Sequence, residues 1–105
     1  MRRNNQVAAL NKIIHERARL LILTYLMSNQ KKEISFNELQ EQLQFTSGNL
    51  SIQLKKLREA EYVEIHKTFK DNKPYTTVLI TPRGAKALSS YVEEMEVIIQ
   101  TLKRT

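Results

Sequence analysis

Two helix-start signals lie close together in the middle of the chain and leave room for only a very short connection between their helices. Ser35 is followed three residues later by Glu38, a spacing in which each side chain can satisfy the other's backbone N–H group at a helix N-terminus. Thr46 can cap the next helix, so only the dipeptide QF remains for the turn between the two. Two short helices joined by so tight a turn predict a helix-turn-helix over residues 35–62.

The second of these helices has two edges of different character. Leu50, Leu54 and Leu57 recur at the i, i+4, i+7 spacing of a helix that lies on a hydrophobic core. The opposite edge and its flanks carry small, amide, hydroxyl and lysine side chains, which suit the major groove of DNA better than a protein core. This second edge consists of Gly48, Asn49, Ser51, Ile52, Lys55, Lys56 and Glu59.

Beyond this helix the pattern changes to the alternation of β-strands. Residues 63–70 alternate between two faces, the string DNKP signals a turn, and YTTVLIT at 75–81 is rich in β-branched and aromatic residues. We therefore expect a two-stranded hairpin. Thr81 as N-cap and Pro82 at the first helical position then open a last helix that continues to about residue 103.

The last helix carries a longer apolar stripe than a compact domain of this size needs. From Leu88 to Leu102 its apolar residues follow spacings of 4, 3, 4 and 3, a heptad seam over about two repeats. We expect it to pair with the same helix of a second copy; the alternative is that it folds back on its own core. The predicted dimer interface consists of Val7, Leu10, Leu88, Tyr91, Val92, Met95, Ile99 and Leu102.

The elements follow in the order helix, strand, helix, helix, hairpin and helix, which is that of a winged helix-turn-helix. The chain has 105 residues and no obvious linker, so a single domain is predicted. Its fold class is mainly α with a small β-hairpin (α+β), with extended N- and C-terminal dimerisation helices. The expected parts are an N-terminal dimerisation segment (1–14), the helix-turn-helix (35–62), the wing (63–81) and a C-terminal dimerisation helix (82–105).

The charge balance favours a polyanionic partner. Lys and Arg number 17 against 11 Asp and Glu, giving a net charge of +6, and nucleic acid is the commonest such partner of a soluble domain. A basic but otherwise ordinary small protein is the alternative. The absence of cysteine excludes disulfides, thiolate metal sites and cysteine nucleophiles. The most apolar run, at 20–27, is too short to span a bilayer, so a cytoplasmic location is expected.

No residue pattern suggests catalysis, a cofactor or a metal. There is no Gly-rich phosphate loop, no nucleophile–base arrangement and no H-E-x-x-H motif, so we do not expect an enzyme. His15 and His66 each lack a second ligand at a useful spacing. Glu93, Glu94 and Glu96 are interpreted as a solvated helix face, the alternative being a cation site at a dimer interface.

Four strings carry a resemblance to a known group of proteins. They are HERARLLIL (15–23), ISFNELQEQL (34–43), TSGNLSIQLKKLREAEYVEIHKTF (46–69) and TPRGAKAL (81–88). In combination they resemble small single-domain bacterial and archaeal regulators related to the MarR and ArsR families. The resemblance implies a homodimeric transcription regulator whose third helix enters the major groove of double-stranded DNA while the hairpin wing touches the backbone or the minor groove.

The resemblance and the side-chain chemistry together assign the DNA contacts. The wing departs from its relatives, which often carry arginine at the tip where this chain has DNK. Gln53 lies nearer the apolar edge of its helix, so helix packing is an equal alternative for it. Glu61 stands where relatives commonly have glycine, so the recognition helix is expected to end differently here. The assigned residues are Ser47, Gly48, Asn49, Ser51, Ile52, Gln53, Lys55 and Lys56 on the helix, and Lys67, Lys70 and Lys73 in the wing.

The favoured function is a dimeric, sequence-specific DNA-binding regulator, a repressor, acting on a pseudo-palindromic operator. A small-molecule effector is left open, because some relatives bind aromatic ligands between the wing domain and the dimer helices. Tyr25, Tyr62 and Tyr91 could line such a pocket, and ordinary packing at the core edge is the alternative. The alternative function is a winged helix that serves protein–protein assembly without specific DNA binding.

Overall fold

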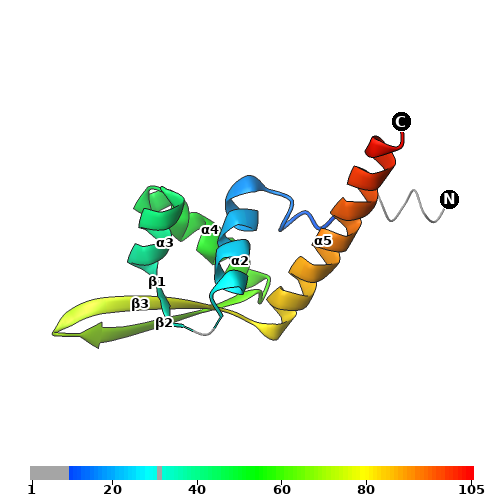
Figure 1. The fold of residues 1–105 in the computed structure, drawn as a ribbon. Coiled ribbons are helices and arrows are strands. Elements are labelled where there is room, and N and C mark those ends of the chain that lie inside the picture. Colours follow the sequence, from blue (N-terminus) through cyan, green and yellow to red (C-terminus); the bar gives the residue numbers. More distant parts are fainter. Residues whose placement is uncertain (1–9, 31) are drawn as a thin grey trace.

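The fold combines four helices and a small three-stranded sheet, drawn in Figure 1 from the computed structural model, which describes residues 10–30 and 32–105. The elements follow the predicted order, so the predicted α+β winged helix architecture is confirmed. They are α2 (Arg17–Ser28), β1 (Ile34–Ser35), α3 (Phe36–Leu43), α4 (Ser47–Glu59), β2 (Val63–Lys70), β3 (Lys73–Ile80) and α5 (Pro82–Lys103).

The sheet has the order β1-β3-β2 with both pairings antiparallel. β1 covers only Thr77 and Val78 of the central strand, so most of the β2–β3 hairpin projects beyond the helices (Figure 1). Its turn is formed by Asp71 and Asn72, whose left-handed φ angles of 54° and 64° are those of a type I′ turn, which matches the twist of the strands. The second strand therefore begins at Lys73, two residues before the predicted start.

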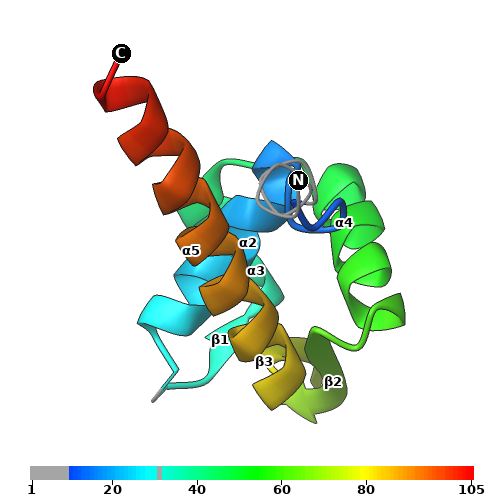
Figure 2. The same cartoon turned by 90° about the vertical axis from the view of Figure 1, so that its right-hand side faces the viewer.

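The hydrophobic core lies between α2, the apolar edge of α4, the sheet and the first half of α5. The predicted apolar edge is confirmed, since Leu50, Leu54 and Leu57 are all buried together with Ile22 and Leu23 of α2. Burial of each such side chain contributes about 1.5–3 kcal/mol. Figure 2 shows α5 passing beside α2 while its C-terminal half extends away from the body of the molecule. Among the helices that the structure describes, none is long and apolar enough to cross a bilayer.

A single helical turn, which we call the N-terminal turn (residues 11–15), precedes α2. The side-chain oxygen of Asn11 accepts hydrogen bonds from the backbone N–H groups of Ile13 and Ile14 at 2.8 and 3.1 Å. The backbone N–H of His15 donates to the carbonyl of Asn11 at 2.7 Å and closes the turn. The turn lies at the end of the predicted N-terminal dimerisation segment (1–14), of which residues 1–9 lie outside the described part.

The predicted caps of the helix-turn-helix form, with one correction. Ser35 and Thr46 accept hydrogen bonds from backbone N–H groups at the starts of α3 and α4. The expectation that the Glu38 side chain accepts a hydrogen bond from the backbone N–H of Ser35 is wrong. Ser35 is also the last residue of β1, so its backbone belongs to the sheet. The Glu38 carboxylate instead accepts a hydrogen bond from the Tyr25 hydroxyl at 2.5 Å and pairs with Lys32 at 3.1 Å. The hydrogen bond from Tyr25 makes the largest contribution to lowering the pKa of the Glu38 carboxyl, and Lys32 lowers it further.

The end of α4 also differs from expectation. Glu61 adopts the left-handed conformation, with a φ of 66°, that glycine usually takes at this position, so the predicted different ending is wrong. The N–H groups of Glu61 and Tyr62 donate to the carbonyls of Arg58 and Leu57 at 2.8 and 2.9 Å, the two bonds of a Schellman motif. The hydroxyl of Thr81 donates to the carbonyl of Glu61 at 2.7 Å. These bonds offset the conformational strain.

The start of α5 is packed directly against this α4 ending. The N–H of Thr81 donates to the carbonyl of Tyr62 at 3.0 Å, and Gly84 lies in the next turn, buried against the same carbonyl. A Cβ added at Gly84 would overlap with the backbone of Tyr62. The glycine therefore permits the close approach that joins α5 to the end of α4.

We predict that alanine at the two glycines of the chain changes the free energy of unfolding differently. Gly84→Ala should lower the free energy of unfolding by about 1–3 kcal/mol, because backbone atoms must shift to admit the methyl group. Gly48→Ala should leave it unchanged or raise it by up to about 1 kcal/mol, because nothing lies within 4 Å of the added Cβ and alanine favours a helix. Urea unfolding followed by circular dichroism measures both, and equal effects would contradict the junction described here.

Candidate nucleic-acid interface

The outward edge of α4 carries most of the residues that the sequence assigned to DNA. Ile52 is the informative one, because 55% of this apolar side chain is exposed among polar neighbours. Gly48 adds no side chain, and none of the described residues lies within 4 Å of the place where a Cβ would stand. The described residues therefore leave this edge open to a partner. Its exposed members are Ser47, Gly48, Asn49, Ser51, Ile52, Lys55 and Lys56.

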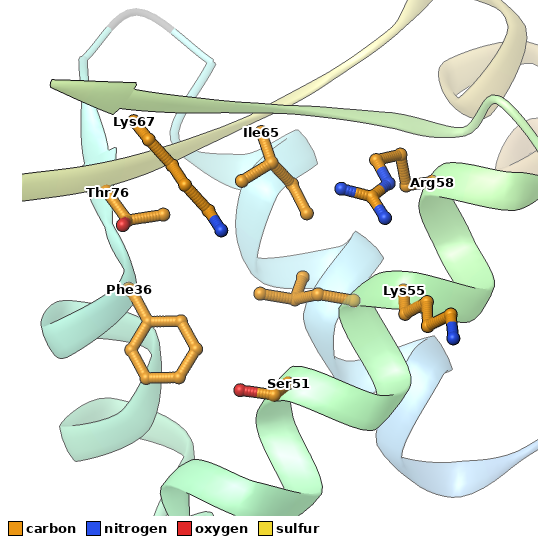
Figure 3. A pocket seen from close by; sticks show the side chains of 8 residues that line it. Phe36, Ser51, Lys55, Arg58, Ile65, Lys67 and Thr76 are labelled. Carbon is orange, nitrogen blue, oxygen red and sulfur yellow. The ribbon is translucent and has the colours of Figure 1, made fainter.

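A cleft of about 390 Å³ lies between this helix and the wing, and we call it the basic cleft (Figure 3). Lys67 points from β2 into the space in front of α4, and Arg58 approaches the same space from the end of the helix (Figure 3). Its apolar floor includes Leu54 and Ile65. The residues that line it are Phe36, Ser51, Leu54, Lys55, Arg58, Ile65, Lys67 and Thr76.

The basic cleft has the chemistry of a phosphate-binding surface. Three cationic side chains, Lys55, Arg58 and Lys67, share it with the hydroxyls of Ser51 and Thr76. Lysine, arginine and hydroxyl side chains supply most protein contacts to DNA phosphates. Arg58 is not among the predicted DNA contacts, although its position three residues after Lys55 and seven after Ser51 places it on the same edge of the helix.

Gln53 is partly buried and is engaged within the protein. Its amide oxygen accepts a hydrogen bond from Nη1 of Arg19 at 2.7 Å, and its amide nitrogen donates to Oδ1 of Asn49 at 3.1 Å. Of the two roles proposed for Gln53, the contacts correspond to helix packing. Asn49 remains exposed, and the bond from Gln53 fixes the orientation of its side chain.

Arg19 is the buried cation behind this arrangement, and the sequence analysis did not single it out. It is 9% exposed, and its Nε donates to the carbonyl of Ile13 in the N-terminal turn at 2.6 Å. Its guanidinium also lies 3.8 Å from the carboxylate of Glu16. Burial alone would raise the pKa of Glu16, but hydrogen bonds from the backbone of Arg19 and Ala18 and the nearby positive charges lower it. A buried guanidinium needs such partners.

The three predicted wing lysines do not share one face of the hairpin. Lys67 lies on the inner face, toward α4, where it lines the basic cleft. Lys70 and Lys73 are paired directly across the turn at the tip. The ammonium of Lys70 lies 4.7 Å from the centre of the Tyr75 ring, a cation–π contact that orients it. The wing therefore presents one lysine beside α4 and two at its far end.

Comparison with known proteins identifies the family. A family model described as a winged helix DNA-binding domain matches residues 18–99, most of the chain. The chain belongs to this family. An uncharacterized protein of Methanocaldococcus jannaschii is 37% identical over 84 residues, which are 80% of this chain and 89% of that protein.

Two solved structures share the winged helix fold. A transcriptional regulator homologue from Pyrococcus horikoshii OT3 superposes with a TM-score of 0.85 at 24% identity, covering 97% of this chain and 98% of that chain. MepR of S. aureus, solved in complex with DNA, gives a TM-score of 0.72 at 17% identity and covers 98% and 81% of the two chains. These likenesses show that the chain has the fold of winged helix DNA-binding regulators.

The winged helix domain uses only part of the apolar stripe of α5 for its own core. Leu88 and Tyr91 are buried within the single chain, which leaves them little surface for the predicted dimer contact. Val92, Ile99 and Leu102 are exposed by 46, 43 and 70%. The predicted interface is thereby narrowed to the outer half of α5, with Met95 half-buried between the two parts. Leu10 packs against the core, and Val7 lies outside the described residues.

The three tyrosines that could line a ligand pocket each bond to a different residue of the domain. Tyr62 accepts a hydrogen bond from the side chain of Asn11 at 2.8 Å, and the Tyr91 hydroxyl lies 2.7 Å from Nδ1 of His15. Tyr25 bonds to Glu38. Tyr91 lines a cleft of about 320 Å³ to which neither Tyr25 nor Tyr62 contributes. Within residues 10–30 and 32–105, no group of three His, Asp or Glu side chains could hold a metal ion.

The link between Arg19 and α4 predicts unequal effects of two substitutions at Gln53. Gln53→Leu should lower the free energy of unfolding by about 1–3 kcal/mol, because it leaves a buried guanidinium N–H without an acceptor. Gln53→Glu should retain most of the stability, since its carboxylate still accepts from Arg19. Chemical unfolding of the two variants beside the wild type measures the difference. Equal losses would show that Arg19 does not depend on the amide oxygen.

Proposed function

We propose that this winged helix protein is a sequence-specific regulator of transcription that binds double-stranded DNA as a homodimer. One observation carries the proposal: the exposed edge of α4 ends at a cleft with three cations, so base-reading and phosphate-binding groups are adjacent. In DNA recognition, phosphate contacts fix the register and base contacts supply the specificity. The fold shared with MepR, which has been solved with DNA, supports the same conclusion.

We infer the contacts from the chemistry of the exposed side chains. Asn49 can make two hydrogen bonds to an adenine edge, and Ile52 can pack on a thymine methyl group. Lys55 and Arg58 lie where the edge of α4 meets the basic cleft and can reach phosphates on either side of the groove. Lys56, Ser47 and Ser51 supply further polar contacts, whereas Gln53 acts by holding Asn49.

The dimer in this proposal forms through the outer half of α5. Val92 and Ile99 lie two helical turns apart on the same side of the helix. Both are exposed in the single chain, as expected of residues that become buried only when two helices pair. Two-fold symmetry would present two recognition helices to half-sites roughly 34–36 Å apart. A dimer seated on an operator would block access of other proteins to the same DNA, and we therefore propose repression as the outcome.

The salt dependence of DNA binding tests the proposal. Duplexes selected from a randomised pool should bind the wild type with an affinity that falls steeply as salt rises. Lys55→Ala and Arg58→Ala should each reduce the slope of log affinity against log salt by about 1 and weaken all sequences alike. Ile52→Ala should leave that slope unchanged and relax the sequence preference, because it removes no charge.

The control is Lys86→Ala, which removes an exposed cation from α5 without touching the basic cleft. It should leave both slope and preference unchanged. Selection that yields no preferred sequence, with weak and non-saturating binding, would contradict the proposal and favour a protein-assembly module.

We also predict that Val92→Glu combined with Ile99→Glu yields a monomer. Four like charges in the paired seam, two from each copy, cannot be desolvated. DNA affinity should fall with the dimer, because each half-site is then bound alone. Light scattering measures the mass, and Val97→Glu, which changes an exposed valine outside the heptad spacing, is the matched control. A wild type that is monomeric at micromolar concentration would contradict the dimer.

A further inference from the structure

The tip of the wing carries an apolar pair that the core does not use. Phe69 of β2 is 75% exposed, and Pro74 of β3 lies directly opposite it and is exposed as well. Both lie beyond Thr77 and Val78, where β1 covers β3, so no third strand among the described residues reaches them. Large apolar side chains at a solvated hairpin tip contribute little to folding and are costly to expose.

The pair faces the same side as the basic cleft. Successive side chains of a strand alternate between its faces, so Phe69 lies on the face of Ile65 and Lys67, both of which line the cleft beside α4. Lys70 and Tyr75 are held together by their cation–π contact on the other face. Phe69 and Pro74 thus form an apolar end to the surface that α4 and the cleft begin.

The surroundings of this pair indicate which partner it fits. Lys67 lies on the same face as the pair, Lys70 and Lys73 lie at the tip on the opposite face, and Asp71 is the one acidic side chain at the tip. Positive charge on both faces of the tip complements a phosphate backbone, and it would oppose the approach of the wing of a second, equally basic copy. The charges therefore favour DNA as the occupant over another copy of this chain.

We propose that Phe69, backed by Pro74, is an apolar wedge that enters the minor groove and partly unstacks a base step beside each half-site. This inference rests on the proposed DNA-binding function and adds a contact to it. Phe and Pro are among the side chains that other minor-groove proteins insert between base steps, with the cost of unstacking repaid by a longer contact surface. Pyrimidine–purine steps such as TA unstack most easily, so the wedge selects for flexible A·T-rich flanks.

The test uses 2-aminopurine, an adenine analogue whose fluorescence rises when it unstacks. The probe is an A·T-rich duplex of about 30 base pairs, long enough for two half-sites and their flanks, with the analogue placed at each TA step in turn. The wild type should raise the fluorescence at one or more steps. Phe69→Ala should abolish the rise and weaken binding about tenfold, the scale of one lost base–aromatic contact.

Two variants separate a wedge from a general weakening of the wing. Phe69→Leu keeps an apolar side chain and should retain part of the fluorescence rise. Thr68→Ala alters the neighbouring position on the opposite face and should change neither signal. The hairpin itself should survive each change, which circular dichroism can check.

The fluorescence test can refute the wedge without refuting the proposed DNA-binding function. At low salt the probe is bound through its phosphates without a preferred sequence, so the wedge can be observed even where specific recognition fails. If the wild type binds the probe without a fluorescence rise, or Phe69→Ala retains the rise, the wedge is refuted while the proposed function stands. Self-association that is lost in Phe69→Ala would instead assign the pair to a second copy and would also overturn the inference.

Discussion

The position of α4 depends on one buried guanidinium. Arg19 sits in α2 but bonds outward in two directions, to the carbonyl of Ile13 in the N-terminal turn and to the amide of Gln53 in α4. The Arg19 side chain is only 9% exposed, so these two acceptors replace the water that a charged group would otherwise bind. Moving away from them would leave its charge buried without partners. Apolar packing of α4 on the core would tolerate a small rotation of the helix about its axis, whereas a directed hydrogen bond to one side chain does not. The outward face of α4 is thereby fixed in angle.

A second constraint joins the other parts of the interface to that helix. The Schellman ending of α4, the start of β2 and the start of α5 meet at the carbonyls of Glu61 and Tyr62, both of which accept hydrogen bonds from Thr81. Gly84 lets α5 approach this point closely. The wing leaves the domain from the same junction. Backbone contacts, and not long side chains, therefore set the angle between the wing and α4. This angle in turn sets the width of the basic cleft.

Local chemistry predicted much of the fold and less of the site. Caps at Ser35 and Thr46 and the leucine edge of α4 follow from spacings within one turn of helix, and these were correct. The bond from Arg19 to Gln53 joins residues 34 positions apart, and no periodicity reports such a contact. Glu61 shows that tertiary bonds can hold a residue in a conformation its own preference opposes. The apolar spacing of α5 predicted which face of the helix is hydrophobic. It did not predict that the fully buried part of this face ends at Tyr91.

Gly48 has a consequence that concerns the partner more than the protein. Inside the domain nothing demands a glycine there, because open space surrounds its Cα and its backbone is that of an ordinary helix. Glycine in a helix forgoes up to about 1 kcal/mol relative to alanine. In the proposed complex with DNA, the missing side chain of Gly48 leaves room for the partner to approach the first turn of α4 closely.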